Sequence, residues 1–144
     1  MTRLLRSFSK NVLVVGALTI ALAPQALRAQ CSNATLKGTY VVSESGMVGT
    51  GPAFGPMAVV ALVTFNGDGT GTVVAVTRTV AGQTTTSSNV PVTYTVNPDC
   101  TGSETAAGGT FNLVITPDGN TITLIAMSAG VTLQGTGIRR TTFN

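Results

Sequence analysis

The feature that most constrains the fold is a short-period pattern that begins near Thr35 and continues almost to the C-terminus. Apolar side chains, mostly valine and isoleucine, alternate with threonine and serine. Glycine-containing turn signals interrupt this alternation at intervals of about ten residues, a spacing typical of sandwiches and barrels. No window beyond Thr35 has the spacing of an amphipathic helix. The pattern therefore predicts an all-β domain.

The turn signals divide this region into eight predicted strands. The stretches Asn66–Gly69 and Pro117–Asn120 supply residues that tolerate the positive φ angles of short hairpin turns. One connection, Gly46–Pro56, is longer and rich in Gly and Pro, and we expect that it does not extend a sheet. The short connections favour pairing between sequence neighbours. The predicted strands are Thr35–Ser45, Met57–Phe65, Thr70–Val80, Thr84–Val96, Cys100–Ala106, Thr110–Thr116, Thr121–Met127 and Val131–Arg139.

An eight-stranded antiparallel meander leaves two open edges unless it closes on itself, and closing into a small barrel removes both. The strand Val131–Arg139 would then pair with Thr35–Ser45. The alternative is an immunoglobulin-like sandwich, which needs Greek-key crossovers and usually a core tryptophan, and the chain has no tryptophan. The barrel is the preferred prediction. Its interior would be just wide enough to be filled by side chains or to hold one small ligand.

The first 29 residues have the composition of a secretory signal peptide. A basic start is followed by the uncharged apolar run Val12–Ala23, and Ala29 offers a small residue for cleavage before Gln30. The run is shorter than the roughly 20 residues that span a bilayer, so we expect no stable membrane span after cleavage, an uncleaved anchor being the alternative. We predict a signal peptide over residues 1–29, a single barrel domain over residues 30–144, and a secreted or periplasmic location.

Charge and cysteine content fit this prediction. Beyond residue 29 the chain keeps four basic and five acidic residues, a net charge of −1, and lacks the clustered Lys and Arg of a nucleic-acid-binding surface. Its two cysteines, Cys31 and Cys100, are predicted to form a disulfide, as suits an oxidising compartment, two free thiols being the alternative. Arg139 and Arg140 are interpreted as a solubilising end.

Alternation also predicts which side chains point inward. In the third predicted strand, Thr72 and Val74 share a face with Arg78, and in the first strand Glu44 falls on the apolar face. The second strand is apolar on both faces, so we expect its outer side to be covered by the loop containing Phe54 or by another molecule.

Glu44 and Arg78 are the most informative of these positions, because a carboxylate inside an apolar barrel is costly unless it is paired or neutralised. Arg78 could pair with Glu44, and Tyr40 or Tyr94 could hydrogen-bond it. These four residues are the predicted ligand-binding set. The alternative is that Glu44 and Arg78 lie near the barrel mouths and simply reach water.

The segments CSNATLKGTY (31–40), VTFNGDGTG (63–71) and VTYTVNPDCTG (92–102) resemble small exported bacterial β-barrel proteins of unassigned function. Members of that group are similar to allene oxide cyclase-like and calycin barrels such as lipocalins. The resemblance implies a strand-and-turn framework with two cysteines and transfers no catalytic residue. The tryptophan of the lipocalin G-x-W signature is replaced here by Tyr40.

The residue types present exclude several common kinds of catalytic and metal site. The chain contains no histidine, which removes the commonest general base and the usual zinc and copper ligands, and we predict no catalytic triad, metal site or cofactor. The first hypothesis is therefore a barrel that binds a small apolar or amphipathic ligand in its lumen. The alternatives are a structural or surface-associating extracellular module and a cyclase- or isomerase-type enzyme. The residues favour no particular oligomeric state.

Overall fold

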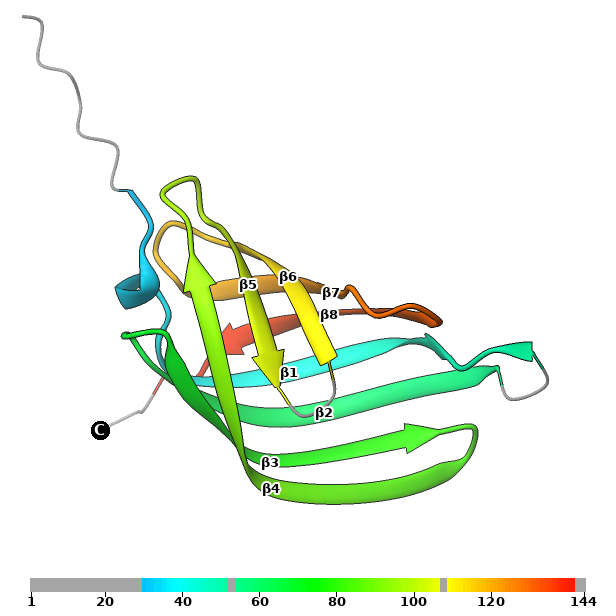
Figure 1. Cartoon of the computed structure of the whole chain (residues 1–144). Coiled ribbons are helices and arrows are strands. Elements are labelled where there is room, and N and C mark those ends of the chain that lie inside the picture. The colour runs from blue at the N-terminus through cyan, green and yellow to red at the C-terminus, as the bar shows by residue number, and fades with distance from the viewer. Residues whose placement is uncertain (1–29, 52–53, 107–108, 142–144) are drawn as a thin grey trace, which may run out of the picture.

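The computed structural model describes residues 30–51, 54–106 and 109–141. Eight antiparallel strands follow one another in a meander and close into a barrel, because β1 pairs with both β2 and β8 (Figure 1). The predicted fold class is confirmed, and the sandwich alternative is excluded. The elements are η1 (Asn33–Thr35), β1 (Lys37–Val48), β2 (Gly55–Asn66), β3 (Thr70–Val80), β4 (Gln83–Val96), β5 (Thr101–Ala106), β6 (Gly109–Ile115), β7 (Thr121–Ala126) and β8 (Val131–Arg139).

The predicted signal peptide, residues 1–29, lies outside the described residues. Across the part of the chain that the structure does describe, no helix combines the length and the apolar character needed to cross a bilayer.

The strands differ in length, and this gives the barrel two unlike halves. Strands β1–β4 have 11 to 14 residues, whereas β5, β6 and β7 have six or seven. Strand β5 pairs with β4 only over Thr93–Val96, so the earlier part of β4 continues beyond it. Figure 1 shows β1–β4 extending well past the ends of β5 and β6. We call the end at which all eight strands meet the closed half, and the end formed mainly by the extensions of β1–β4 the open half.

Aromatic side chains fill the closed half. The rings of Tyr40 and Phe65 meet edge to face with centroids 5.4 Å apart, and Phe65 meets Tyr94 in the same way at 5.0 Å. These rings pack with aliphatic side chains that are almost completely buried, among them Leu36 and Leu113. Edge-to-face pairs of this kind are favourable beyond the area that they bury.

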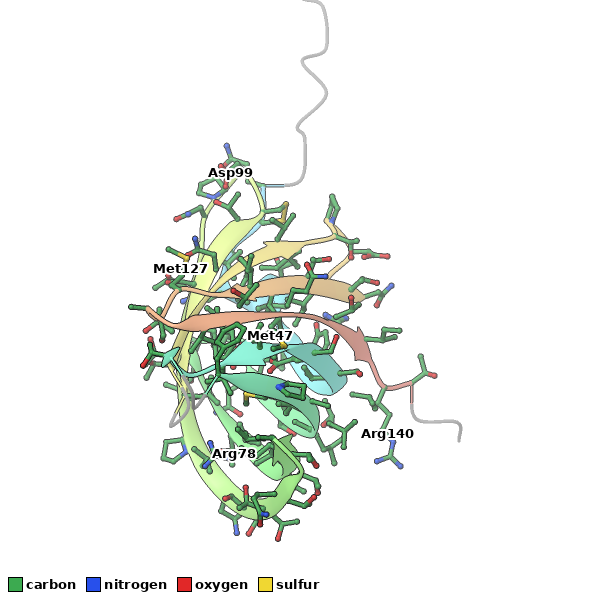
Figure 2. The ribbon with its side chains drawn as sticks, turned by 90° about the vertical axis from the view of Figure 1, so that its right-hand side faces the viewer. Met47, Arg78, Asp99, Met127 and Arg140 are labelled. Carbon is green, nitrogen blue, oxygen red and sulfur yellow. A yellow bond between two sulfur atoms is a disulfide. The ribbon has the colours of Figure 1, made fainter. Side chains whose placement is uncertain are left out.

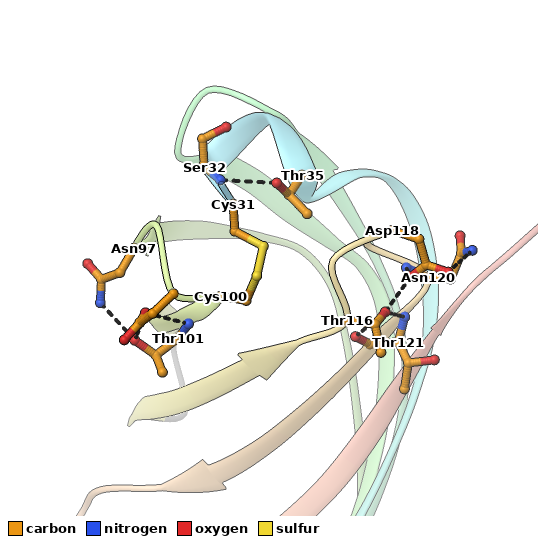
Figure 3. The surroundings of a disulfide bond; sticks show 11 residues. Cys31, Ser32, Thr35, Asn97, Cys100, Thr101, Thr116, Asp118, Asn120 and Thr121 are labelled. Carbon is orange, nitrogen blue, oxygen red and sulfur yellow. Dashed lines mark hydrogen bonds between the residues drawn. A yellow bond between two sulfur atoms is a disulfide. The ribbon is translucent and has the colours of Figure 1, made fainter. Parts of the chain in front are cut away.

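The N-terminal segment is tied to this end by the predicted disulfide, which is confirmed. Cys31 and Cys100 are bonded with Cα atoms 5.0 Å apart, and the link closes a separation of 69 residues (Figure 3). Next to it, the Asn33 side chain accepts a hydrogen bond from the backbone N–H of Val96 at 2.8 Å. Leu36, which follows η1, is completely buried. The segment therefore caps the closed half.

Strand β3 departs from the simple alternation of the prediction. Leu62 pairs with Ala75 but Val63 pairs with Val73, so β3 holds one extra residue at this point. Because of this bulge Val73 is buried and Val74 is exposed, and the predicted inward position of Val74 is wrong. Beyond the bulge the faces return to the predicted ones, and Arg78 lies on the inward face of β3. On β4, Asn89 lies beside the bulge with a φ of 56°, a conformation that asparagine tolerates better than most residues.

The long connection is shorter than predicted, because β1 continues to Val48 and β2 already starts at Gly55. Gly46 permits this extension, since a Cβ atom there would overlap the carbonyl of Thr132 in β8. The expectation that the loop covers the outer face of β2 is also wrong: Val60 remains 58% exposed and Phe54 is itself half exposed.

Candidate functional site

The open half encloses a cavity of about 390 Å³. Its wall is mostly apolar, because valine occupies most of the inward-facing positions of the long strands and β6–β8 contribute further apolar side chains. This volume lies within the range of roughly 300–1,000 Å³ that is typical of small-molecule sites. Among the lining side chains are Val59, Val76, Val90, Phe111, Leu124 and Leu133.

Three charged side chains line this apolar cavity, and they come from three different strands: Glu44 from β1, Arg78 from β3 and Glu104 from β5. Glu44 lies in register with Val59 of β2, and Val59 lies in register with Arg78. On the other side Glu44 faces Gly135 of β8, where any side chain would collide with the Glu44 stem. The absence of a side chain at this position leaves room for the Glu44 carboxyl.

Burial changes the acidity of both carboxyls. Glu104 is only 8% exposed, and loss of hydration raises its pKa to about 7, with a further upward contribution from the negative charge of Glu44. The pKa of Glu44 is also raised to about 7 by burial. The two carboxyls line the same cavity. Near neutral pH each can therefore either hold or release a proton.

Arg78 does not neutralise these carboxyls. Its side chain is exposed, and its Nε donates a hydrogen bond to Thr85 Oγ1 on the adjacent strand β4 at 3.1 Å. No ion pair within 4 Å joins it to Glu44 or Glu104 in the described structure. Figure 2 shows Arg78 toward the β3–β4 hairpin, far from the Asp99 turn. The structure thus places Glu44 and Arg78 on one cavity wall without the direct pairing that the sequence suggested.

Tyr40 and Tyr94 do not line the cavity, although alternation correctly places them inside the barrel. The Tyr40 hydroxyl donates to the carbonyl of Gly119. The Tyr94 hydroxyl donates to the carbonyl of Leu36 at 2.8 Å and accepts from the N–H of Gly67 at 2.9 Å. Both side chains extend toward the closed half, so neither binds Glu44. Their placement makes them part of the core and not of the ligand-binding set.

The interpretation of Arg139 as a solubilising residue is also wrong. Its Nε and Nη2 donate to the Tyr40 hydroxyl at 3.1 and 3.0 Å, and Nη2 also donates to the carbonyl of Thr35 at 2.8 Å. Its guanidinium carbon lies 5.5 Å from the centre of the Tyr40 ring. Arg140 is exposed, as adjacent strand residues on opposite faces require. Arg139 is therefore a structural contact of the closed half.

Glu104 is the site residue that the sequence analysis did not single out, yet a signal for it exists. In β5 the outward positions are Thr101, Ser103 and Thr105, which leaves Glu104 on the same face as Gly102 and Ala106. Its neighbours on that face are small and no apolar stripe marks the face as internal. The strand therefore looks polar throughout, and only its place in a closed barrel shows that Glu104 is buried.

The turn aspartates belong to the turns and not to a site. In two turns an Asn-x-Asp-x-Thr sequence repeats: Asp68 Oδ1 accepts from the backbone N–H and hydroxyl of Thr70, and Asp99 Oδ1 does the same with Thr101. These bonds hold the pKa of each aspartate below its usual value. Over the described residues no group of three or more His, Cys, Asp or Glu side chains could hold a metal ion.

Comparison of the chain with known protein families, with curated proteins and with solved structures finds no match. The strand pairing confirms the closed eight-stranded barrel, and a calycin or allene oxide cyclase-like relationship stays a prediction from the sequence.

Proposed function

We propose that this protein is a small binding barrel that holds an amphipathic molecule in the cavity of its open half. The observation that carries the proposal is the cavity itself: about 390 Å³ of space with an apolar wall and a few charged groups. Sites for small ligands combine these features, with apolar surface supplying affinity and a few polar groups fixing orientation. The closed half, filled by aromatic rings, provides a rigid base for the site.

We also propose that the protein acts outside the inner membrane. The Cys31–Cys100 disulfide fits an extracellular or periplasmic compartment. Export through a signal peptide at residues 1–29 and a calycin-like ancestry belong to this proposal and rest on the sequence.

Binding can be tested with three probes that share one octyl chain: 1-octanol, octylamine and sodium nonanoate. Titration calorimetry and native mass spectrometry of the oxidised protein should show one-to-one binding of at least one probe. Ala61→Phe, which places a ring in the cavity, should weaken that binding at least tenfold. Ala58→Phe is the matched control, because Ala58 lies on the same strand but is exposed on the outer face. Absence of binding by all three probes would refute the proposal.

The two carboxyls favour a second function, acid–base catalysis on the bound molecule. Groups with a pKa near 7 are well matched to proton transfer at neutral pH, so one of Glu44 and Glu104 could accept a proton while the other donates one. This would suit an isomerisation or cyclisation that needs no cofactor. Turnover of a candidate substrate that persists unchanged in Glu44→Gln, Glu104→Gln and Arg78→Ala would exclude it, provided that each variant still binds the probe.

A further inference from the structure

The charged groups of the cavity differ in how far their hydrogen-bonding capacity is used. Glu104 is more than nine-tenths buried, yet it has no hydrogen-bond or ion-pair partner in the described part of the chain. Every described side-chain N or O atom that is fully sealed from solvent has a partner, so the Glu104 oxygens open onto the cavity. A buried carboxyl without a partner is rare in a native protein and calls for a physical explanation.

The only cation among the lining residues cannot supply this partner where it stands. Arg78 is held against β4 by Thr85. Its Cα is separated from that of Glu44 by Val59 on the intervening strand, a distance of about 10 Å at two strand spacings. The inner part of the cavity therefore carries two acidic groups, Glu44 and Glu104, and no counter-charge from the described chain.

We infer that the cavity takes a small amphipathic primary amine, whose ammonium group lies between Glu44 and Glu104 and whose apolar chain lies along the valine-rich wall. This inference rests on the proposed binding function and specifies the class of its ligand. An ammonium offers three donors and a positive charge, which matches two carboxylates that otherwise lack partners. Binding of a carboxylate ligand at the same place would bring a third negative charge into an apolar site.

The size of the cavity agrees with this class of ligand. At roughly 30 Å³ per heavy atom, the value for liquid water, octylamine with its nine heavy atoms needs about 270 Å³. This fits inside 390 Å³. The chain would reach the side chains of Val76 and Phe111, which line the same cavity.

Because the three probes have the same apolar chain, differences in their affinities report on the head group alone. At about pH 8 both carboxyls are largely ionised and the amine keeps its proton, since alkylamines have a pKa near 10.4. Octylamine should then bind at least tenfold more tightly than 1-octanol, and nonanoate should bind most weakly. If 1-octanol or nonanoate binds as tightly as octylamine, the inferred class is wrong but cavity binding stands. If no probe binds, the proposed function itself fails.

Variants of single carboxylates test whether Glu104 is responsible for the preference for an ammonium head group. Glu104→Gln should lower the affinity for octylamine about tenfold and leave that for 1-octanol within about twofold, because the amide keeps the shape but not the charge. Asp68→Asn removes a charge from an exposed turn and is the matched control. Equal loss of amine affinity in Glu104→Gln and Asp68→Asn would contradict a specific carboxylate contact.

The pH dependence gives an independent check. The charged groups facing the bound amine are Glu44 from β1, Glu104 from β5 and, at the mouth, Arg78 from β3. Because burial raises the pKa of both carboxyls to about 7, ionisation of one carboxyl increases about tenfold between pH 6 and pH 8. Octylamine affinity should increase by about this factor, while 1-octanol affinity should not. A flat profile for octylamine would overturn the inference.

Discussion

The same strands line a filled core in the closed half of the barrel and a cavity in the open half. Strand β1 shows this contrast between Tyr40 and Glu44, which are four residues apart. Tyr40 and Glu44 point to the same interior, yet Tyr40 lies in a filled core and its hydroxyl contacts Gly119 and Arg139. Glu44 lines an empty space and has no hydrogen-bond partner in the described structure. Where all eight strands meet, polar groups inside the barrel are satisfied by the protein. Where β5–β7 end, space and unsatisfied carboxyls remain together, as a ligand site requires.

The strongest test of this division is removal of the disulfide, which holds only the closed half. In the chain-entropy model a link across 69 residues stabilises the folded state by about 4 kcal/mol. The double variant Cys31→Ala/Cys100→Ala should lose a comparable amount in guanidinium denaturation. Where it still folds, probe binding in the open half should be retained. A loss below about 1 kcal/mol would show that the N-terminal segment is held by other contacts.

Two phenylalanines sharpen the comparison between halves. Phe65 is 2% exposed and contacts both tyrosine rings, so Phe65→Ala should cost at least about 3 kcal/mol. Phe111 lines the cavity and is only partly buried, so Phe111→Ala enlarges an existing space and should cost about 1 to 2 kcal/mol. Urea denaturation of both variants gives the difference. Equal losses would mean that the open half is as tightly packed as the closed half.

The carboxyls of the open half should destabilise the protein once they ionise. The pKa of Glu104 is about 7 when folded, against 4.5 as a reference for the unfolded chain. The folded state therefore holds this proton between about pH 4.5 and 7 while the unfolded state has released it, and stability decreases as pH increases through this window. At about 1.4 kcal/mol per pH unit, the stability lost across this window reaches about 3 kcal/mol by the time the pH exceeds 7.

Glu104→Gln removes this contribution. The variant should be more stable than the parent by about 2 to 3 kcal/mol at pH 8 and nearly equal to it below about pH 4.5. Thermal denaturation across this pH range measures the difference. Asp68→Asn should show no such gain, since Asp68 is exposed and its pKa is lowered. Stability that increases from pH 5 to pH 7 in the parent would contradict the buried state of the carboxyls.

Much of the fold could be predicted because the controlling signals are local. Turn residues such as Asn66–Gly69 and Pro117–Asn120 mark where strands end, and all eight strands occur close to the predicted ranges. The long connection is the exception. Glycine at position 46 is typical of a loop, but the close approach of β8 leaves no room for a side chain there and so requires glycine within the strand. That requirement comes from a strand almost ninety residues later in the chain and leaves no local trace.

The site was harder to predict, because alternation gives the face of a strand and not the depth along the barrel. It correctly placed Tyr40 and Tyr94 inside, but not their direction toward the closed half. The bulge at Val74 shifts the pattern by one residue without any glycine or proline to mark it. Alternation places Glu104 on the same face of β5 as Gly102 and Ala106, but only the closed barrel shows that this face is internal. What no local pattern contains is that Glu44 and Glu104, from β1 and β5, share one cavity.

The smallest expected difference concerns two arginines, one in each half. Arg139 makes three hydrogen bonds at the closed end and stacks near the Tyr40 ring, so Arg139→Ala should cost about 1 to 3 kcal/mol. Arg78 is exposed and makes one bond, to Thr85, so Arg78→Ala should change stability by less than about 0.5 kcal/mol. Denaturation of both variants tests this ranking.

Because Arg78 lies at the mouth and repels a cation, its removal should leave octylamine binding unchanged or slightly tighter. A large stability loss in Arg78→Ala would show that the arginine is needed to balance the two carboxyls, and the open half would then resemble the closed half in satisfying its own charges.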